Sequence, residues 1–197
     1  MPKQLRYELN NSKKIYTTTE LRALGYTRYA VERMSEIGML EKITGSVYEN
    51  ALFEGEESDF YYVMPLVPGG IICMLSAAVY YNLSTYWAHD IDVAVKKGKR
   101  IVTMPAYPSM NIYHFGKDRY EIGIDTVNID GNEYKIYDIE KTVIDIIYFR
   151  NQIGIQETKE ILTKYLHRMD CNINKLHRYA QKLQCEKTLR TYLEVLI

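Results

Sequence analysis

The chain has 197 residues, of which 47% are hydrophobic, and its 25 Lys and Arg balance 25 Asp and Glu. This length allows one domain or two, while the hydrophobic fraction excludes a wholly disordered chain. A net charge of zero excludes a protein whose entire surface binds polyanions. The three cysteines form no CxxC pair, which argues against a disulfide framework or a zinc site and favours the reducing cytoplasm.

The first fifty residues predict three short helices and a hairpin. We expect a helix over 2–13, a short β segment at 15–17, a helix capped by Thr19 and a helix that follows Thr27. Alternating residues around Thr44-Gly45-Ser46 predict two strands at 40–43 and 47–49. Helices followed by a two-stranded wing are typical of the winged helix-turn-helix, whose second helix lies in the DNA major groove.

The helix after Thr27 carries apolar residues at helical spacing, namely Val31, Met34 and Ile37. Its other face is charged and aromatic, and basic residues precede and follow it. The DNA contacts expected from this pattern are Lys13, Lys14, Arg22, Arg28, Tyr29, Arg33, Lys42 and Ser46. The alternative is a solvated helical hairpin, which Glu32 and Glu36 favour because carboxylates repel phosphate.

A composition shift follows the hairpin, because residues 51–70 contain four acidic residues and no Lys or Arg. We therefore predict a winged helix-turn-helix domain at 1–52 and a second domain at 58–197. The second domain is predicted to be α+β. Its expected strands are 59–64, 91–95, 112–115, 120–129 and 133–137, and its expected helices are 70–83, 138–150, 155–168, 174–183 and 186–196.

Residues 60–89 contain no Asp, Glu, Lys or Arg and are the one candidate for a membrane segment. Prolines and glycines at 65–70 interrupt it, and the remaining apolar run of about thirteen residues is shorter than the roughly twenty that span a bilayer. The first residues also lack the apolar region of a signal peptide. We therefore expect a buried core helix, no membrane partner and a cytoplasmic protein.

Chemical motifs are few in the second domain. The basic run Lys96–Arg100 is either a phosphate-facing patch or a charged loop. Asp90 and Asp92 share one face of a strand without a third ligand, so we expect a charged outer face. Lys141 and Asp145 are expected to pair on a helix surface. Because the histidines show no metal-ligand spacing and no catalytic loop motif occurs, the sequence favours a protein that is not an enzyme and has no cofactor or metal.

Three segments are similar to a known family. They are YTTTELRALGYTRYAVERMSEIGMLEKITGSVY (16–48), GGIICMLSAAVYYNLSTYWAHDIDVAVKKGKR (69–100) and IYDIEKTVIDIIYFRNQIG (136–154). In this combination the chain resembles the AbiEi antitoxins of bacterial type IV toxin–antitoxin (abortive infection) systems. Asp138 stands where that family usually has Ser.

The resemblance implies a repressor that binds inverted repeats in the promoter of its own operon. It also implies an antitoxin that neutralises a cognate nucleotidyltransferase toxin, AbiEii, without forming a stable complex. By position, Thr27, Arg28, Tyr29, Arg33 and Lys42 would serve DNA. The antitoxin-domain candidates are Lys96, Lys97, Lys99, Arg100, Lys141, Asp145 and Arg150. Two alternatives remain, a direct toxin-binding antitoxin and an enzyme that reverses the reaction of the toxin, with Lys141, Asp145 and the basic run Lys96–Arg100 forming its site.

Overall fold

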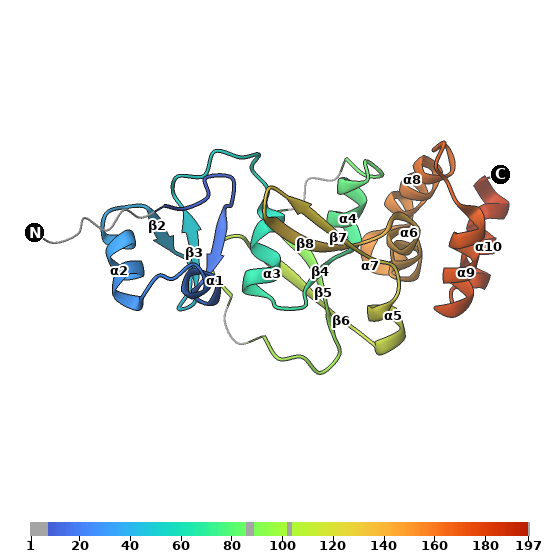
Figure 1. Cartoon of the computed structure of the whole chain (residues 1–197). Helices are drawn as coiled ribbons and strands as arrows, with labels where there is room; N and C mark the ends of the chain where they lie inside the picture. The colour runs from blue at the N-terminus through green and yellow to red at the C-terminus, as the bar shows by residue number, and fades with distance from the viewer. Residues whose placement is uncertain (1–7, 86–88, 102–103, 197) are drawn as a thin grey trace, which may run out of the picture.

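The computed structural model of the chain describes residues 8–85, 89–101 and 104–196. It is elongated, with α1, α2 and a small sheet at one end, a larger sheet in the middle, and α9 and α10 at the other end (Figure 1). The architecture is mixed α+β with two sheets, as predicted. Within the described ranges, no helix is both long and apolar enough to cross a membrane.

The first sheet is antiparallel, in the order β1-β3-β2. The elements of this part are β1 (Ile15–Thr17), α1 (Thr18–Ala23), α2 (Arg28–Glu36), β2 (Leu40–Lys42) and β3 (Val47–Asn50). The hairpin β2–β3 and the strand at 15–17 agree with the sequence prediction. Residues 8–13 are not helical, contrary to the expected helix at 2–13, whose earlier residues lie outside the described ranges.

Both helices of this part begin at threonine caps. Thr17, rather than the predicted Thr19, caps α1, because its hydroxyl accepts the Glu20 N–H while the Glu20 carboxylate accepts the Thr17 N–H. Thr27 caps α2 as predicted, with its hydroxyl 3.2 Å from the Ala30 nitrogen. Between the helices, Gly25 has a φ of +90°, a value that glycine reaches at little cost.

The apolar side of α2 packs on the small sheet. Val31 and Met34 are buried there, as predicted, together with Leu21 and Tyr48. Ile37 is 49% exposed, contrary to the prediction. The reason is that α2 ends at Glu36, so Ile37 lies at the C-cap, where the chain leaves the helix.

The second sheet has five strands, in the order β6-β5-β4-β8-β7. They are β4 (Ile71–Ile72), β5 (Ile91–Lys96), β6 (Met110–Phe115), β7 (Ile124–Ile129) and β8 (Asn132–Tyr137). The pairs β5–β6 and β4–β8 are parallel, and the pairs β4–β5 and β7–β8 are antiparallel. The helical elements are η1 (Asp59–Tyr62), α3 (Val63–Leu66), α4 (Met74–Tyr80), α5 (Lys117–Glu121), α6 (Ile139–Tyr148), α7 (Arg150–Ile153), α8 (Ile155–Leu166), α9 (Ile173–Lys182) and α10 (Glu186–Leu196).

Three predicted elements of this second part differ in the structure. The segment 59–64 is helical rather than a strand, and this lets the consecutive residues Tyr61, Tyr62 and Val63 all be buried. The predicted helix at 70–83 gives up Ile71–Ile72 to the sheet and begins at Met74. The predicted strand at 120–129 begins only at Ile124, because 117–121 form α5.

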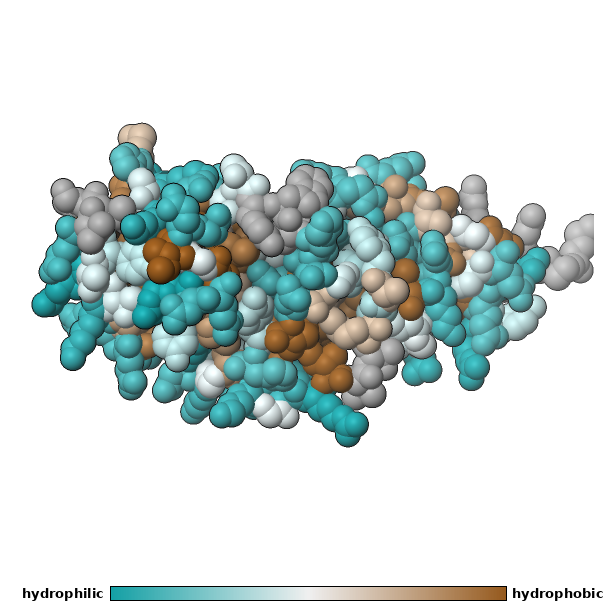
Figure 2. Space-filling view, turned by 180° about the vertical axis from the view of Figure 1, so that it is seen from behind, coloured by the Kyte–Doolittle hydropathy of each residue, from teal (hydrophilic) through white to brown (hydrophobic). Residues whose placement is uncertain are grey.

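The large sheet is covered on both faces. One face packs against η1 and α3 in a cluster that includes Tyr62, Val63, Val93 and Ile136. The other face, with Phe115 and Tyr137, packs against Met74 of α4 and against Phe149 and Ile153. This corrects the expectation for Asp92, which is 3% exposed instead of lying on a charged outer face. Seen from behind, the surface is largely hydrophilic, with hydrophobic residues in separate patches (Figure 2).

The small sheet is joined firmly to the large one. The side chain of Asn132, at the start of β8, accepts the Lys14 N–H at 2.7 Å and donates to the Ser12 carbonyl at 2.6 Å. Ile15 and Val47 of the small sheet belong to the same hydrophobic cluster as Tyr61. The two predicted domains therefore share part of one core.

Candidate nucleic-acid interface

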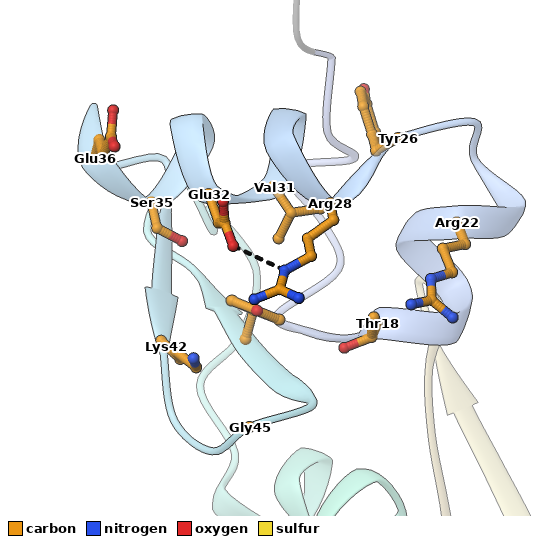
Figure 3. Close-up of a pocket in the computed structure, with 11 residues that line it drawn as sticks. Thr18, Arg22, Tyr26, Arg28, Val31, Glu32, Ser35, Glu36, Lys42 and Gly45 are labelled. Atoms are coloured by element: carbon orange, nitrogen blue, oxygen red, sulfur yellow. Dashed lines mark hydrogen bonds and ion pairs between the residues drawn. The ribbon is translucent and has the colours of Figure 1, made fainter.

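An open groove lies between α2 and the β2–β3 hairpin, with α1 at one end (Figure 3). Its volume is about 740 Å³. The groove is lined by Thr18, Arg22, Tyr26, Arg28, Val31, Glu32, Ser35, Glu36, Lys42, Gly45 and Tyr48. Three of the predicted DNA contacts, one each from α1, α2 and β2, therefore face a single concavity.

Local structure accounts for these positions. Thr27 has an extended backbone and is the N-cap of α2, so Arg28 is the first residue of the helix. The hairpin turn is held against α1, because the Ser46 carbonyl accepts the Thr18 N–H at 2.8 Å and lies 3.2 Å from the Thr18 hydroxyl. Thr27 and Ser46 thus position the groove.

The cations of α2 are paired at the surface. Arg28 Nε donates to Glu32 Oε1 at 2.9 Å, and these side chains are 87% and 56% exposed. Arg33 Nη1 donates to a carboxylate oxygen of Glu36 at 2.8 Å. Exposed pairs of this kind contribute only about 0–1 kcal/mol, so a phosphate or a base edge can displace them.

Tyr29 and Arg33 do not line the groove, although both are predicted contacts. Tyr29 is 73% exposed, and it lies with Arg33 on the part of α2 turned further from the hairpin. The exposed surface of α2 therefore has two parts. Arg28 and Glu32 lie on the part that faces the hairpin, and Tyr29 and Arg33 lie on the part that faces away from it.

Lys13 and Lys14 do not fit the phosphate-binding role predicted for them. Lys13 Nζ lies 2.7 Å from Glu20 Oε1 and donates to the Gly131 carbonyl at 3.3 Å. The Lys14 side chain is only 8% exposed and pairs with Glu57 and Glu49. Both lysines hold the small sheet to the rest of the chain, and the sequence alone did not show the acceptors that occupy them.

The basic run Lys96–Arg100 lies beside the hairpin turn. A cleft of about 520 Å³ is lined by residues 44–47 on one side and by residues 65–68 and 99–101 on the other. The sequence places this run in the second domain and gives no sign that it lies near the hairpin. The run begins at the end of β5, where the crossover required by the parallel pairing of β5 and β6 starts. Within the run, Lys96 pairs with Glu121 at 3.0 Å and Lys97 is exposed.

Lys141 and Asp145 are paired, as predicted, but they are fully buried instead of lying on a helix surface. Arg119 of α5 forms the second ion pair of Asp145, and Lys141 Nζ lies 3.9 Å from the centre of the Tyr137 ring. Burial lowers the pKa of Lys141, and the charge of Asp145 opposes this shift. No spacing in the sequence reveals Arg119 as a partner, because it comes from a different helix.

The basic run and the Lys141–Asp145 pair do not form one site. The pair is sealed from solvent and cannot contact a substrate in this conformation. Arg150, predicted to end the helix of Lys141, instead begins α7 and donates to the Ile147 carbonyl at 3.3 Å. Of the antitoxin-domain candidates, the basic run and the half-buried Arg150 therefore remain at the surface, whereas Lys141 and Asp145 do not.

A smaller cleft, of about 290 Å³, is lined by Asp92 and Asn111 of neighbouring strands and by Leu75 of α4. Burial raises the pKa of this carboxyl, against the effect of hydrogen bonds from Asn111 and from the Leu75 N–H. Among the described residues, no three His, Cys, Asp or Glu side chains are arranged to hold a metal ion.

Comparison with known proteins adds no family to this description: no protein-family model and no curated protein matches the chain.

Proposed function

We propose that the chain is a DNA-binding autorepressor and antitoxin of a type IV toxin–antitoxin system, in which α1, α2 and the β2–β3 hairpin act as a winged helix-turn-helix. The observation that carries this proposal is the groove in which Arg22, Arg28 and Lys42 come together from three elements. In winged helix-turn-helix proteins a helix contacts the major groove, and cations on the helix and the neighbouring hairpin contact the flanking phosphates.

The basic run extends this surface. Lys99 and Arg100 line the cleft next to the hairpin turn, so phosphates that pass the wing would meet them. Such contacts release counterions from DNA, and affinity should therefore fall steeply as the salt concentration rises. The zero net charge of the whole chain is compatible with this, because the cations concerned lie around one groove and one cleft.

The antitoxin role rests on the resemblance of the sequence to the AbiEi family. In this proposal the chain represses its operon at inverted repeats in the cytoplasm and opposes a nucleotidyltransferase toxin without a stable complex. The exposed residues of the basic run are the candidates for that second role. The buried Lys141–Asp145 pair serves the fold.

The first experiment is a titration of the purified chain against its own upstream DNA and against a scrambled duplex, at two salt concentrations. We expect tight, salt-sensitive preference for the upstream DNA. Equal, weak binding to both duplexes would overturn the repressor proposal. The direct toxin-binding antitoxin would then be tested by co-purification with the toxin.

Substitutions in α2 test the interface itself. Arg28→Ala and Arg33→Ala should each weaken binding to the upstream DNA by about 1–3 kcal/mol if they contact bases. Arg190→Ala is the matched control, because Arg190 is exposed on α10 at the far end of the molecule (Figure 1). Unchanged affinity in both α2 variants, with the fold intact, would contradict the assignment of α2 as the recognition helix.

A further inference from the structure

We propose that Glu32 selects a cytosine in the target DNA, by accepting a hydrogen bond from its N4 amino group while Arg28 donates to a guanine. This inference rests on the proposed DNA-binding function and names the base pairs that α2 recognises.

The starting observation is a negative charge where a polyanion is expected to dock. Glu32 is 56% exposed, lines the groove and points into it beside Arg28 (Figure 3). A carboxylate at this position repels phosphates and lowers affinity for every DNA sequence. It becomes favourable only where the DNA presents a hydrogen-bond donor.

The chemistry of the major groove restricts that donor. Amino groups occur there only on cytosine N4 and adenine N6, and adenine places its N7 acceptor beside the amino group. Because a carboxylate has no proton to donate to N7, adenine presents it with a repulsive lone pair. Cytosine has no such acceptor in the major groove, which makes it the preferred partner of Glu32.

The geometry of the pair suits two neighbouring base pairs. Arg28 and Glu32 are one turn apart on α2, which is about 6 Å along the helix axis. Their hydrogen bond uses Arg28 Nε. A bidentate contact to guanine N7 and O6 can therefore use the terminal N–H groups of the guanidinium while Glu32 keeps it oriented.

Glutamine at this position should change the base preference, rather than only weaken binding. A carboxamide can accept from adenine N6 no better than a carboxylate, but it donates to N7 as well, and Gln is the usual bidentate partner of adenine. Glu32→Gln should therefore move the preference at one position of each half-site from cytosine toward adenine. Glu32→Ala should abolish the preference.

The experiment measures binding of the full chain to its upstream DNA and to a set of duplexes with each base pair substituted in turn. We expect the wild-type chain to lose about 10- to 100-fold in affinity when the selected cytosine is replaced. Glu32→Ala should lose this discrimination and bind the scrambled duplex more tightly. Thermal unfolding of each variant checks that the fold is unchanged.

Glu41→Gln is the matched control, because it removes the same charge from an exposed residue of β2 that does not line the groove. It should strengthen binding to the scrambled duplex while leaving the base preference unchanged. Identical base preferences in the wild type and in Glu32→Gln would overturn the inference, as would a Glu32→Ala variant that gains the same factor on upstream and scrambled DNA. Failure of the DNA-binding proposal is distinct, because the wild type itself would then show no preference for its upstream DNA.

Discussion

At the level of single residues, Asp145 is the buried anion that balances two cations in the interior of the C-terminal part. Its carboxylate is fully buried and forms ion pairs with Lys141 and with Arg119, which is itself only 12% exposed. Asp145→Asn would leave two cations without their counter-charge, and we expect it to lower the free energy of unfolding by about 3–5 kcal/mol.

Lys141→Met is the informative counterpart, because Asp145 would keep Arg119 as its partner and an apolar chain of similar length would fill the space. We expect a change of less than about 1.5 kcal/mol. Urea denaturation of both variants measures the difference. Equal losses would contradict the view that Asp145 is the shared centre of the network. Any antitoxin assay on an Asp145 variant should include this stability measurement, because a loss of activity could result from unfolding.

At the scale of an element, β5 carries a carboxyl group in a strand that is covered on both faces. Burial raises the pKa of Asp92 above its unfolded value, so the folded state binds the proton more tightly than the unfolded chain does. The stability from this proton is fully present below the unfolded pKa of about 3.9 and is lost as pH rises through the folded pKa. Asp92→Asn should therefore be more stable than the wild type at pH 7, and this advantage should disappear near pH 3.

Asp170 provides a control of opposite sign. Hydrogen bonds from Arg168, at 2.7 and 2.8 Å, lower the pKa of this exposed carboxyl. Its contribution to stability is present above the unfolded pKa and lost as pH falls, so Asp170→Asn should gain nothing at pH 7. Urea midpoints at the two pH values measure both variants. An Asp92→Asn variant less stable than the wild type at pH 7 would show that its hydrogen bonds outweigh the cost of burying the charge.

At the scale of the whole molecule, the amide of Asn132 joins the two sheets. Besides its bonds to Lys14 and Ser12, it donates to the Ile129 carbonyl at 3.0 Å and is 5% exposed. Asn132→Ala would leave the buried backbone N–H of Lys14, the residue before β1, without its acceptor, and we expect a loss of about 1–3 kcal/mol. It should also speed hydrogen exchange at Lys14.

Asn128→Ala is the control for this joint, since the Asn128 side chain accepts the Gly131 N–H within the same turn. It should leave exchange at Lys14 unchanged. If hydrogen exchange at Lys14 is slow in both variants, the shared apolar cluster around Ile15 and Tyr61 is enough to hold the sheets together. If Asn132→Ala also weakens DNA binding, the position of the basic run relative to the hairpin matters for the interface.

Local signals predicted the elements that depend on neighbours in sequence. Helix α2 follows the cap at Thr27, the hairpin surrounds Gly45, and α6 begins after Asp138, whose carboxylate accepts the Lys141 N–H at 2.8 Å. The segment 59–64 was predicted incorrectly, because a short apolar run is compatible with a strand and with a buried helical turn. Packing of this segment against the large sheet favours the helical conformation.

The candidate site divides in the same way. Arg22, Arg28 and Lys42 were expected to serve one surface, and they do line one groove. Lys14, Lys141 and Asp145 were expected at surfaces but are buried. Their burial is not predictable from nearby residues, because the partners Glu57 and Arg119 lie far from them in sequence. A charged residue carries no local mark that distinguishes an ion pair inside the protein from a solvated side chain.

Local signals in the sequence are enough to predict the mixed α+β class, the capped helix that carries Arg28 and Glu32, and the hairpin beside it. These features depend on capping hydroxyls, turn glycines and apolar spacing within a few residues. The position of Lys99 and Arg100 next to the hairpin turn and the complete burial of Lys141 and Asp145 are seen only in the folded chain. The reason is that burial and proximity arise from contacts between distant segments, and the crossover from β5 to β6 and the docking of α5 on α6 make those contacts.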